Sequence, residues 1–327
     1  MYARRSIFLA AATAFAMTML VGGTRADDMP DGTIKFVVPF PAGASTDVVM
    51  RAIANKVKVS LGNTFIVENK VGAGGMIATD YVAKSTPDGT TLLAIPNSLA
   101  SNPALFKSLP FDTMKDLQPV SLVFRTPLVL IVNADLPVKS LTELIALLKK
   151  KPGELKYAHG GPGSAINLAG VLMQNMTDTK MRGIPYRGTP LALNDLVGSR
   201  VEMMFSDIGG AIGQIQAGKV RAIAVTSGER VAALPDVPTM MEAGLPKFEV
   251  VGWTLVCAPS ATPRATIDKL AAAIGQAVEQ PDVKELLVRI GTVPVKSPSP
   301  DKLKEFLASE ISHWGKLIED AGVAKSL

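Results

Sequence analysis

Short apolar runs alternate along the chain with segments of helical periodicity. The runs are rich in Val, Ile, Leu and Ala and end at turn residues such as Gly, Pro and Asp, a pattern typical of buried strands. Between them, apolar residues recur three or four positions apart, as over 46–61, which predicts helices with one buried face. The expected strands are 34–40, 64–67, 91–95, 120–124, 128–132, 156–158, 183–186, 201–205, 222–226 and 248–258. The expected helices are 46–61, 75–83, 140–151, 165–175, 191–196, 212–217, 263–279, 283–290 and 300–321.

Strands separated by helices of this length predict an α/β fold, with mainly parallel sheets flanked by helices. Two strand-like stretches, 121–132 and 248–257, are candidates for crossings between two halves of the chain. If the chain leaves the first half at one crossing and returns at the other, it forms two lobes. Each lobe then has its own sheet, with a cleft between them. Periodicity alone leaves these crossings open.

The first 26 residues have the pattern of a cleaved secretory signal peptide. Arg4 and Arg5 precede an apolar run over 7–21, and the small residues Thr24 and Ala26 suit a signal peptidase. The run is shorter than the roughly 20 residues that span a bilayer, although a retained anchor is the alternative. The arginine pair leaves open whether export is general or twin-arginine. The lack of a nearby cysteine argues against a lipoprotein.

Composition indicates a globular protein, since 47% of the 327 residues are hydrophobic and 19% are charged. Removal of 1–26 takes away three arginines and no acid, so the net charge falls from +5 to +2. No cluster of Lys and Arg suggests a nucleic-acid partner. The single cysteine, Cys257, lies in an apolar run and is expected to be a buried, inert thiol.

The loop over 38–47 joins a predicted strand to a predicted helix through small residues. The first amides of a helix have no partner within the helix and lie at the positive end of its dipole, so they suit an anion. Gly43 and Ala44 leave room for a ligand to approach the backbone, and Ser45 could donate a hydroxyl or cap the helix. Asp47 falls in the first turn, where it either serves the site or only favours the dipole.

Three further loops follow strands in the same way. These are 158–164, which contains His159; 185–190, which contains Tyr186 and Arg187; and Ser206-Asp207. Ligands of open α/β sheets bind beyond the carboxyl ends of the strands, so the four loops predict one shared cleft. Arg187 could pair with a carboxylate or remain solvated.

The usual signatures of catalysis are missing from the sequence. It holds two histidines, and His313 falls on a polar helix where a surface position is expected. No Gly-x-Ser-x-Gly elbow, phosphate loop, dinucleotide fingerprint or metal-ligand spacing occurs. We therefore expect no catalytic residue, no cofactor and no metal, with His159 as the one candidate acid–base group.

At these loops the chain resembles the solute receptors of tripartite tricarboxylate transporters, the Bug or TctC type. The resemblance covers nearly all of the chain after the signal peptide. It rests on six motifs in order: 38–43 with Asp47; 67–69 with 72–75; 87–92; 185–188; 234–239 with 242–244; and 258–259 with 262–263.

The resemblance implies a two-lobed periplasmic-binding-protein fold of type II, with a hinge of two crossing strands. Its lobes would be 27–126 with 252–327, and 127–251. It further implies a monomeric periplasmic receptor that closes on a small carboxylate and delivers it to a permease of one large and one small subunit. The ligand contacts that it implies are Phe40, Ala42, Gly43, Ala44, Ser45, Asp47, Asn97, Ser98, Gly161, Gly163, Ser164, Tyr186, Gly188 and Asp207.

The chain departs from the family pattern at a few positions. Ala44 replaces a second glycine, and Asn167 replaces a frequent histidine. These changes bear on ligand identity, which stays open among citrate-like acids, dicarboxylates, aromatic acids and acidic amino acids. Two other functions also stay open: a receptor read by a signalling partner, and a small-molecule enzyme that uses His159.

Overall fold

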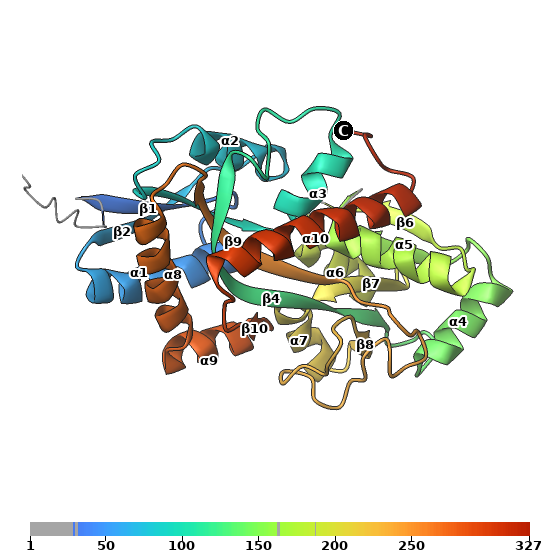
Figure 1. The fold of residues 1–327 in the computed structure, drawn as a ribbon. Helices are drawn as coiled ribbons and strands as arrows, with labels where there is room; N and C mark the ends of the chain where they lie inside the picture. Colours follow the sequence, from blue (N-terminus) through green and yellow to red (C-terminus); the bar gives the residue numbers. More distant parts are fainter. Residues whose placement is uncertain (1–28, 30–31, 162–163, 187) are drawn as a thin grey trace, which may run out of the picture.

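The computed structural model describes residue 29 and residues 32–161, 164–186 and 188–327 (Figure 1). The predicted signal peptide, Gly163 and Arg187 lie outside this part of the chain. The strands within it are β1 (Thr33–Val38), β2 (Thr64–Asn69), β3 (Thr91–Pro96), β4 (Leu117–Asn133), β5 (Lys156–His159), β6 (Arg182–Pro185), β7 (Met203–Asp207), β8 (Val220–Val225), β9 (Val251–Pro259) and β10 (Val293–Pro294). The helices are α1 (Ser45–Leu61), the 3-10 turn η1 (Ala73–Gly75), α2 (Met76–Ala83), α3 (Ser98–Leu105), α4 (Leu141–Lys150), α5 (Ala165–Thr177), α6 (Thr189–Val197), α7 (Ile208–Gln216), α8 (Arg264–Val278), α9 (Pro281–Arg289) and α10 (Pro300–Asp320).

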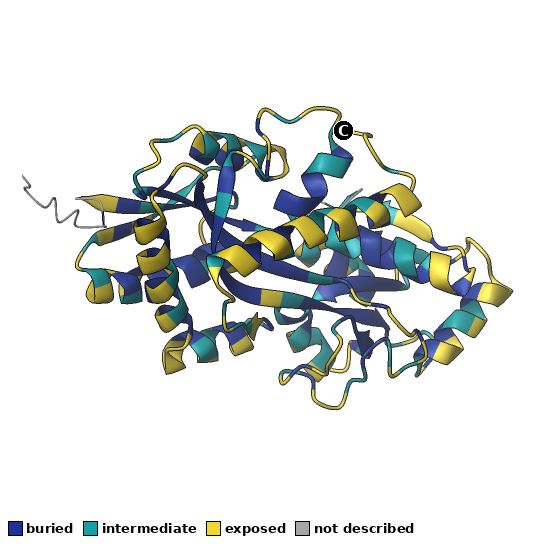
Figure 2. Ribbon diagram, viewed as in Figure 1, coloured by how far each residue is buried: buried dark blue, intermediate teal, exposed yellow. Residues whose placement is uncertain are grey.

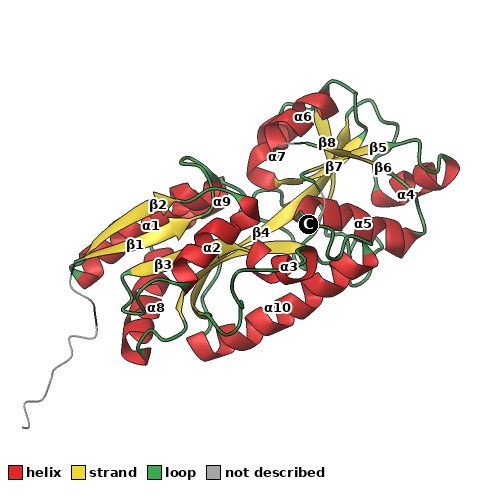
Figure 3. Ribbon diagram, turned by 90° about the horizontal axis from the view of Figure 1, so that it is seen from above, coloured by secondary structure: helices red, strands yellow, loops and turns green. Residues whose placement is uncertain are grey.

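The strands pair in the order β2-β1-β3-β9-β4-β7-β5-β6, and β8 and β10 also pair with β4. We call β2, β1, β3, β9 and the start of β4 the first sheet, and the end of β4 with β7, β5, β6 and β8 the second sheet. The pairs β1–β2, β1–β3, β5–β6 and β5–β7 are parallel, whereas every pair of β4 or β9 is antiparallel. The predicted α/β class, with helices on the faces of the sheets, is confirmed (Figure 3).

Strand β4 corrects one prediction, because the two runs expected at 120–124 and 128–132 form one continuous strand. Its residues up to Pro127 pair with β9, and from Leu128 onward they pair with β7 and β8. Proline has no N–H to donate to a ladder, but Pro127 stands where the partner strand changes, so the strand continues through it. The short helix α3 was not expected from periodicity at all.

The helices bury their apolar faces on both sides of the sheets (Figure 2). Helices α1 and α8 pack on the first sheet through buried side chains such as Val49, Ile53 and Ile267. Helix α10 contacts α3, β4 and α5, so it lies across elements of both sheets (Figure 1). One continuous core therefore joins Leu255 of the first sheet to Phe205 of the second.

The single thiol is buried in the first sheet, as expected. Cys257 is fully covered, and this burial raises the pKa of its thiol. None of the helices in the described part of the chain is long and apolar enough to cross a bilayer.

Candidate functional site

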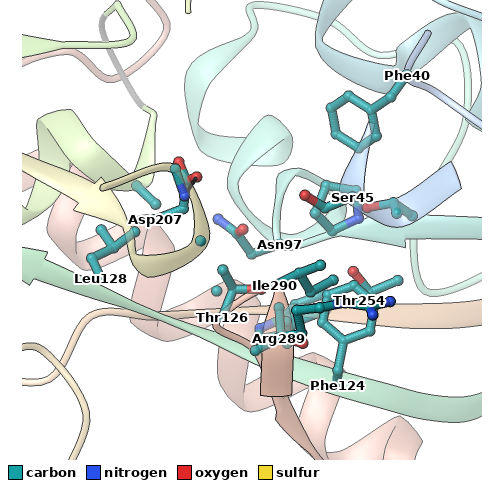
Figure 4. A pocket seen from close by; sticks show the side chains of 18 residues that line it. Phe40, Ser45, Asn97, Phe124, Thr126, Leu128, Asp207, Thr254, Arg289 and Ile290 are labelled. Carbon is teal, nitrogen blue, oxygen red and sulfur yellow. Dashed lines mark hydrogen bonds between the residues drawn. The ribbon is translucent and has the colours of Figure 1, made fainter. Parts of the chain in front are cut away.

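A cavity of about 490 Å³ lies where the two sheets meet, with β4 and β9 contributing to its wall (Figure 4). A second cavity of about 410 Å³ adjoins it, and Phe40, Pro96, Asn97 and Ala165 line both. We call them the main and the adjoining cavity. The main cavity is lined by Phe40, Ser45, Thr46, Pro96, Asn97, Phe124, Thr126, Leu128, Ala165, Asp207, Gly209, Gly210, Gly252, Trp253, Thr254, Arg289, Ile290 and Thr292.

Four helices begin at the main cavity, namely α1, α3, α5 and α7. Two of them are capped by a side chain: Ser164 accepts from the amide of Asn167 at 3.2 Å, and Asp207 accepts from that of Gly210 at 3.2 Å. Helices α1 and α3 have no side-chain cap, because Ala44 and Asn97 at their N-caps accept no such bond. Their uncapped starts are the places in the cavity best suited to an external anion.

Asp47 fixes the shape of the loop before α1 from beneath. Its carboxylate accepts from the Gly43 amide at 2.9 Å, from the Arg51 guanidinium at 2.9 and 3.0 Å, and from the Asn69 side chain at 2.8 Å. Burial alone would raise its pKa, but these donors together hold the pKa of Asp47 below its usual value. The residue is 1% exposed and does not line the cavity, so Asp47 lies beneath the loop and outside the cavity wall.

The glycine loop after β5 is held by its own polar groups. The Gly161 amide donates to Nδ1 of His159 at 3.1 Å, and the Ser164 hydroxyl donates to the Gly161 carbonyl at 2.8 Å. His159 is buried against Tyr157, and this burial lowers the pKa of its imidazole. The lowered pKa favours the neutral imidazole, and His159 lines neither cavity.

The loop after β6 contacts the cavity wall through Thr189, which lines neither cavity itself and was not among the expected contacts. The Tyr186 hydroxyl donates to Asp195 at 2.8 Å, and burial together with this carboxylate raises the pKa of Tyr186 to about 12. Thr189 instead donates to Asp207 at 3.0 Å. The Asp207 carboxylate thus has a donor on each oxygen and is held at the cavity wall by α6 and α7.

The structure brings together six of the predicted contact residues. Phe40, Ser45, Asn97 and Asp207 line the main cavity, and Ser98 and Ser164 line the adjoining one. Seven others line neither cavity, namely Ala42, Gly43, Ala44, Asp47, Gly161, Tyr186 and Gly188.

Sequence reasoning missed the wall made by β4, β9 and α9. Thr126 and Gly252 are paired neighbours on the two crossing strands, so the crossing prediction was a signal that could have found them. Trp253 lines the cavity and donates from its indole nitrogen to Glu310 at 2.5 Å, and Trp314 donates to the same oxygen at 2.9 Å. Arg289 ends α9, and nothing in its local sequence marks it as part of a site.

The start of α7 and the turn after α9 touch backbone to backbone beside the cavity. A Cβ on Gly209 would overlap the carbonyl oxygen of Ile290 and lie 2.8 Å from its carbon. A Cβ on Gly291, whose φ is +75°, would lie 2.6 Å from the Gly209 nitrogen. A side chain on either glycine would overlap the backbone of the other segment, so the start of α7 and the turn after α9 are in direct backbone contact.

A small-molecule cavity at the junction of two helix-flanked sheets, over two antiparallel connecting strands, defines a solute-binding protein of the periplasmic type. The solved structures that are similar to the chain include the following three. The periplasmic binding protein BugD is 35% identical, with a TM-score of 0.77 over 90% of this chain and 99% of that chain. Rpa4515 of R. palustris, with adipate, is 31% identical, with a TM-score of 0.79 over 90% and 99%. MatC of Rhodopseudomonas palustris, with bound malate, is 35% identical, with a TM-score of 0.75 over 89% and 100%.

Residues 49–323 match the family model of the tripartite tricarboxylate transporter family receptor. The chain belongs to this family, as the motifs in its loops indicated. Its members are receptors that bind solutes, and BugD is a periplasmic one.

Proposed function

We propose that this protein captures a small carboxylate in the main cavity and delivers it to a two-subunit membrane permease. The observation that carries the proposal is the pair of uncapped helix starts, at Ser45 of α1 and Asn97 of α3, which offer free amides to an anion. The adipate of Rpa4515 and the malate of MatC support the ligand class.

We propose that the ligand is held between two lobes, 27–126 with 252–327 and 127–251. The change of partner in β4 between Pro127 and Leu128, and the start of β9 at Val251, support this division. The two connecting segments would then act as the hinge, and closure is favoured by contacts that the ligand makes with both lobes. A cleaved signal peptide at 1–26 would place this monomeric receptor in the periplasm.

Binding without turnover fits the chemistry of the cavity wall. Among the lining residues that the structure describes, Asp207 and Arg289 are the only ionised side chains, and both oxygens of Asp207 already accept hydrogen bonds, from Thr189 and from the Gly210 amide. Nor does the described part of the chain hold a cluster of three potential metal ligands. We therefore propose a receptor and not an enzyme.

A thermal-shift screen of residues 27–327 against small carboxylates tests the ligand class. A ligand that binds only the folded state raises the melting temperature. At a concentration of 100 times its Kd it adds about 2.7 kcal/mol to the free energy of unfolding. The variant Ser45→Asp tests the site, because it places a fixed carboxylate at the start of α1, which the helix tolerates but which excludes an anionic ligand.

The matched control is Ser299→Asp at the start of α10, another helix without a side-chain cap and away from both cavities. We expect Ser45→Asp to abolish the ligand-induced shift while the unliganded melting temperature holds, and Ser299→Asp to behave as wild type. A panel in which no carboxylate shifts the melting temperature would overturn the proposal, and so would an unchanged shift in Ser45→Asp.

A further inference from the structure

The main cavity has one basic side chain, Arg289, and one acidic side chain, Asp207, among its lining residues that the structure describes. Asp207 already has a use, because it caps α7 and accepts from Thr189. The start of α7 is thereby closed to a ligand carboxylate. Arg289 has no such partner among the described residues, and it lies exposed at the cavity wall.

Arg289 differs from most other arginines of the described chain in having no partner there. Arg51, Arg200, Arg230 and Arg264 bind carboxylates, and Arg221 donates to three backbone carbonyls. Arg289 is exposed, and within the described ranges its guanidinium makes no ion pair with a carboxylate and no hydrogen bond. A guanidinium has five donors in a planar fork that matches a carboxylate, so an unpaired one at a cavity wall is available to an anion.

The backbone that carries Arg289 is firmly held although its side chain is unpaired. Thr292 donates to the Leu287 carbonyl from both its amide and its hydroxyl, at 2.9 Å each, which closes the turn after α9. The contact of Gly291 with Gly209 then fixes this turn against α7. The end of α9 that carries Arg289 is thus held at a defined place beside the cavity.

The cavity therefore offers two separate places to negative charge. The starts of α1 and α3 offer uncharged amides near Ser45 and Asn97, whereas α9 offers the full positive charge of Arg289 (Figure 4). A ligand with one carboxylate satisfies only one of them. A small acid with two carboxylates satisfies both, and a volume of about 490 Å³ holds such a molecule.

We infer that Arg289 binds a second anionic group of the ligand, so that the receptor selects dicarboxylates over monocarboxylates of the same length. This rests on the proposed function, since it assumes that a first carboxylate is bound at α1 and α3. Arg289 is then a residue that determines specificity, and Asp207 favours hydroxyl or ammonium groups on the ligand beside it.

Calorimetry tests this with diacids from malonate to suberate, each beside the monocarboxylate of the same chain length, at one pH and ionic strength. We expect wild type to prefer a diacid, and Arg289→Gln to weaken that diacid about 10- to 100-fold while leaving its monocarboxylate within about twofold. Arg289→Lys should restore part of the preference, because it restores the charge without the fork. The control is Arg182→Gln on β6, an exposed arginine that makes the same charge change and lines neither cavity.

Each outcome separates the inference from the proposal beneath it. If no carboxylate binds to wild type, the proposed function itself fails. If carboxylates bind but Arg289→Gln keeps the preference for diacids, the role of Arg289 is overturned and the proposed function stands. A variant that loses diacids and monocarboxylates equally also overturns the inference, since Arg289 would then hold the first carboxylate.

Discussion

The backbone contact between Gly209 and the turn after α9 predicts that a methyl group at position 209 weakens ligand binding. Gly209 lines the cavity, and a methyl group there would overlap the Ile290 carbonyl oxygen. The obstacle is backbone, which cannot rotate away as a side chain can. Gly209→Ala must therefore push the start of α7 away from α9.

The size of the effect follows from overpacking, which costs about 1–3 kcal/mol in a well-packed site. If this cost falls on the closed arrangement that binds ligand, affinity drops by about 5- to 150-fold. Gly213 of the same helix provides the control, because a Cβ there meets nothing within 4 Å. Gly213→Ala should even add about 0.5–1 kcal/mol of stability, since alanine favours a helix over glycine.

The assay is a titration with the acid that gives the largest thermal shift, followed through the emission of Trp253 at the cavity wall. The melting temperature without ligand is measured in parallel, to separate loss of binding from loss of folding. We expect weak binding for Gly209→Ala and wild-type binding for Gly213→Ala. Equal affinities for the two variants would refute the idea that this contact sets the approach of the sheets.

Three further predictions concern ionisation and burial. Because burial lowers the pKa of His159, the unfolded chain binds a proton more readily than the folded one, and the free energy of unfolding should fall as the pH drops from 7 to 5. Urea unfolding of His159→Gln should show a smaller loss over this range, whereas the exposed-site control His313→Gln should show the same loss as wild type. Asp47→Asn should lower the free energy of unfolding by about 1–3 kcal/mol at pH 7. The substitution replaces one carboxylate oxygen by an NH2 group, which would face the donors of Arg51 and Asn69 and accept from neither. Since its pKa is lowered in the folded state, this difference should vanish in urea titrations as the pH falls through that value, and a difference that persists at low pH would contradict the assignment. Cys257 should resist a thiol reagent in the native protein and react only on unfolding; prompt native labelling would contradict its burial.

The parts of the site that local sequence determines could be predicted. A strand followed by small residues and a helix puts polar groups at the carboxyl edge of a sheet, and this rule found Ser45 and Asp207, whereas Asn97 was expected only from the family resemblance. The rule works because the turn, the cap and the helix start are all set within a few residues.

The parts that depend on long-range packing could not be predicted. Asp47 lies at the right loop but turns inward, because Asn69, twenty-two positions later, and Arg51 bind its carboxylate. The Arg51 pairing was readable as an i, i+4 ion pair, whereas the Asn69 pairing was not. Arg289 reaches the cavity only because α9 packs beside β10 and the start of α7, which no local pattern encodes.

The pairing of β3 with β9 has a consequence for how the chain folds. Leu93 lies beside Cys257, 164 positions later, so the sheet that forms first in the sequence is completed by a strand near its end. Such distant pairings must close a long loop before they gain any contact energy, which makes folding slow. The α1 region therefore gains its full support only after most of the polypeptide is present, so a chain shortened at its C-terminal end before β9 would lack the strand that completes the first sheet.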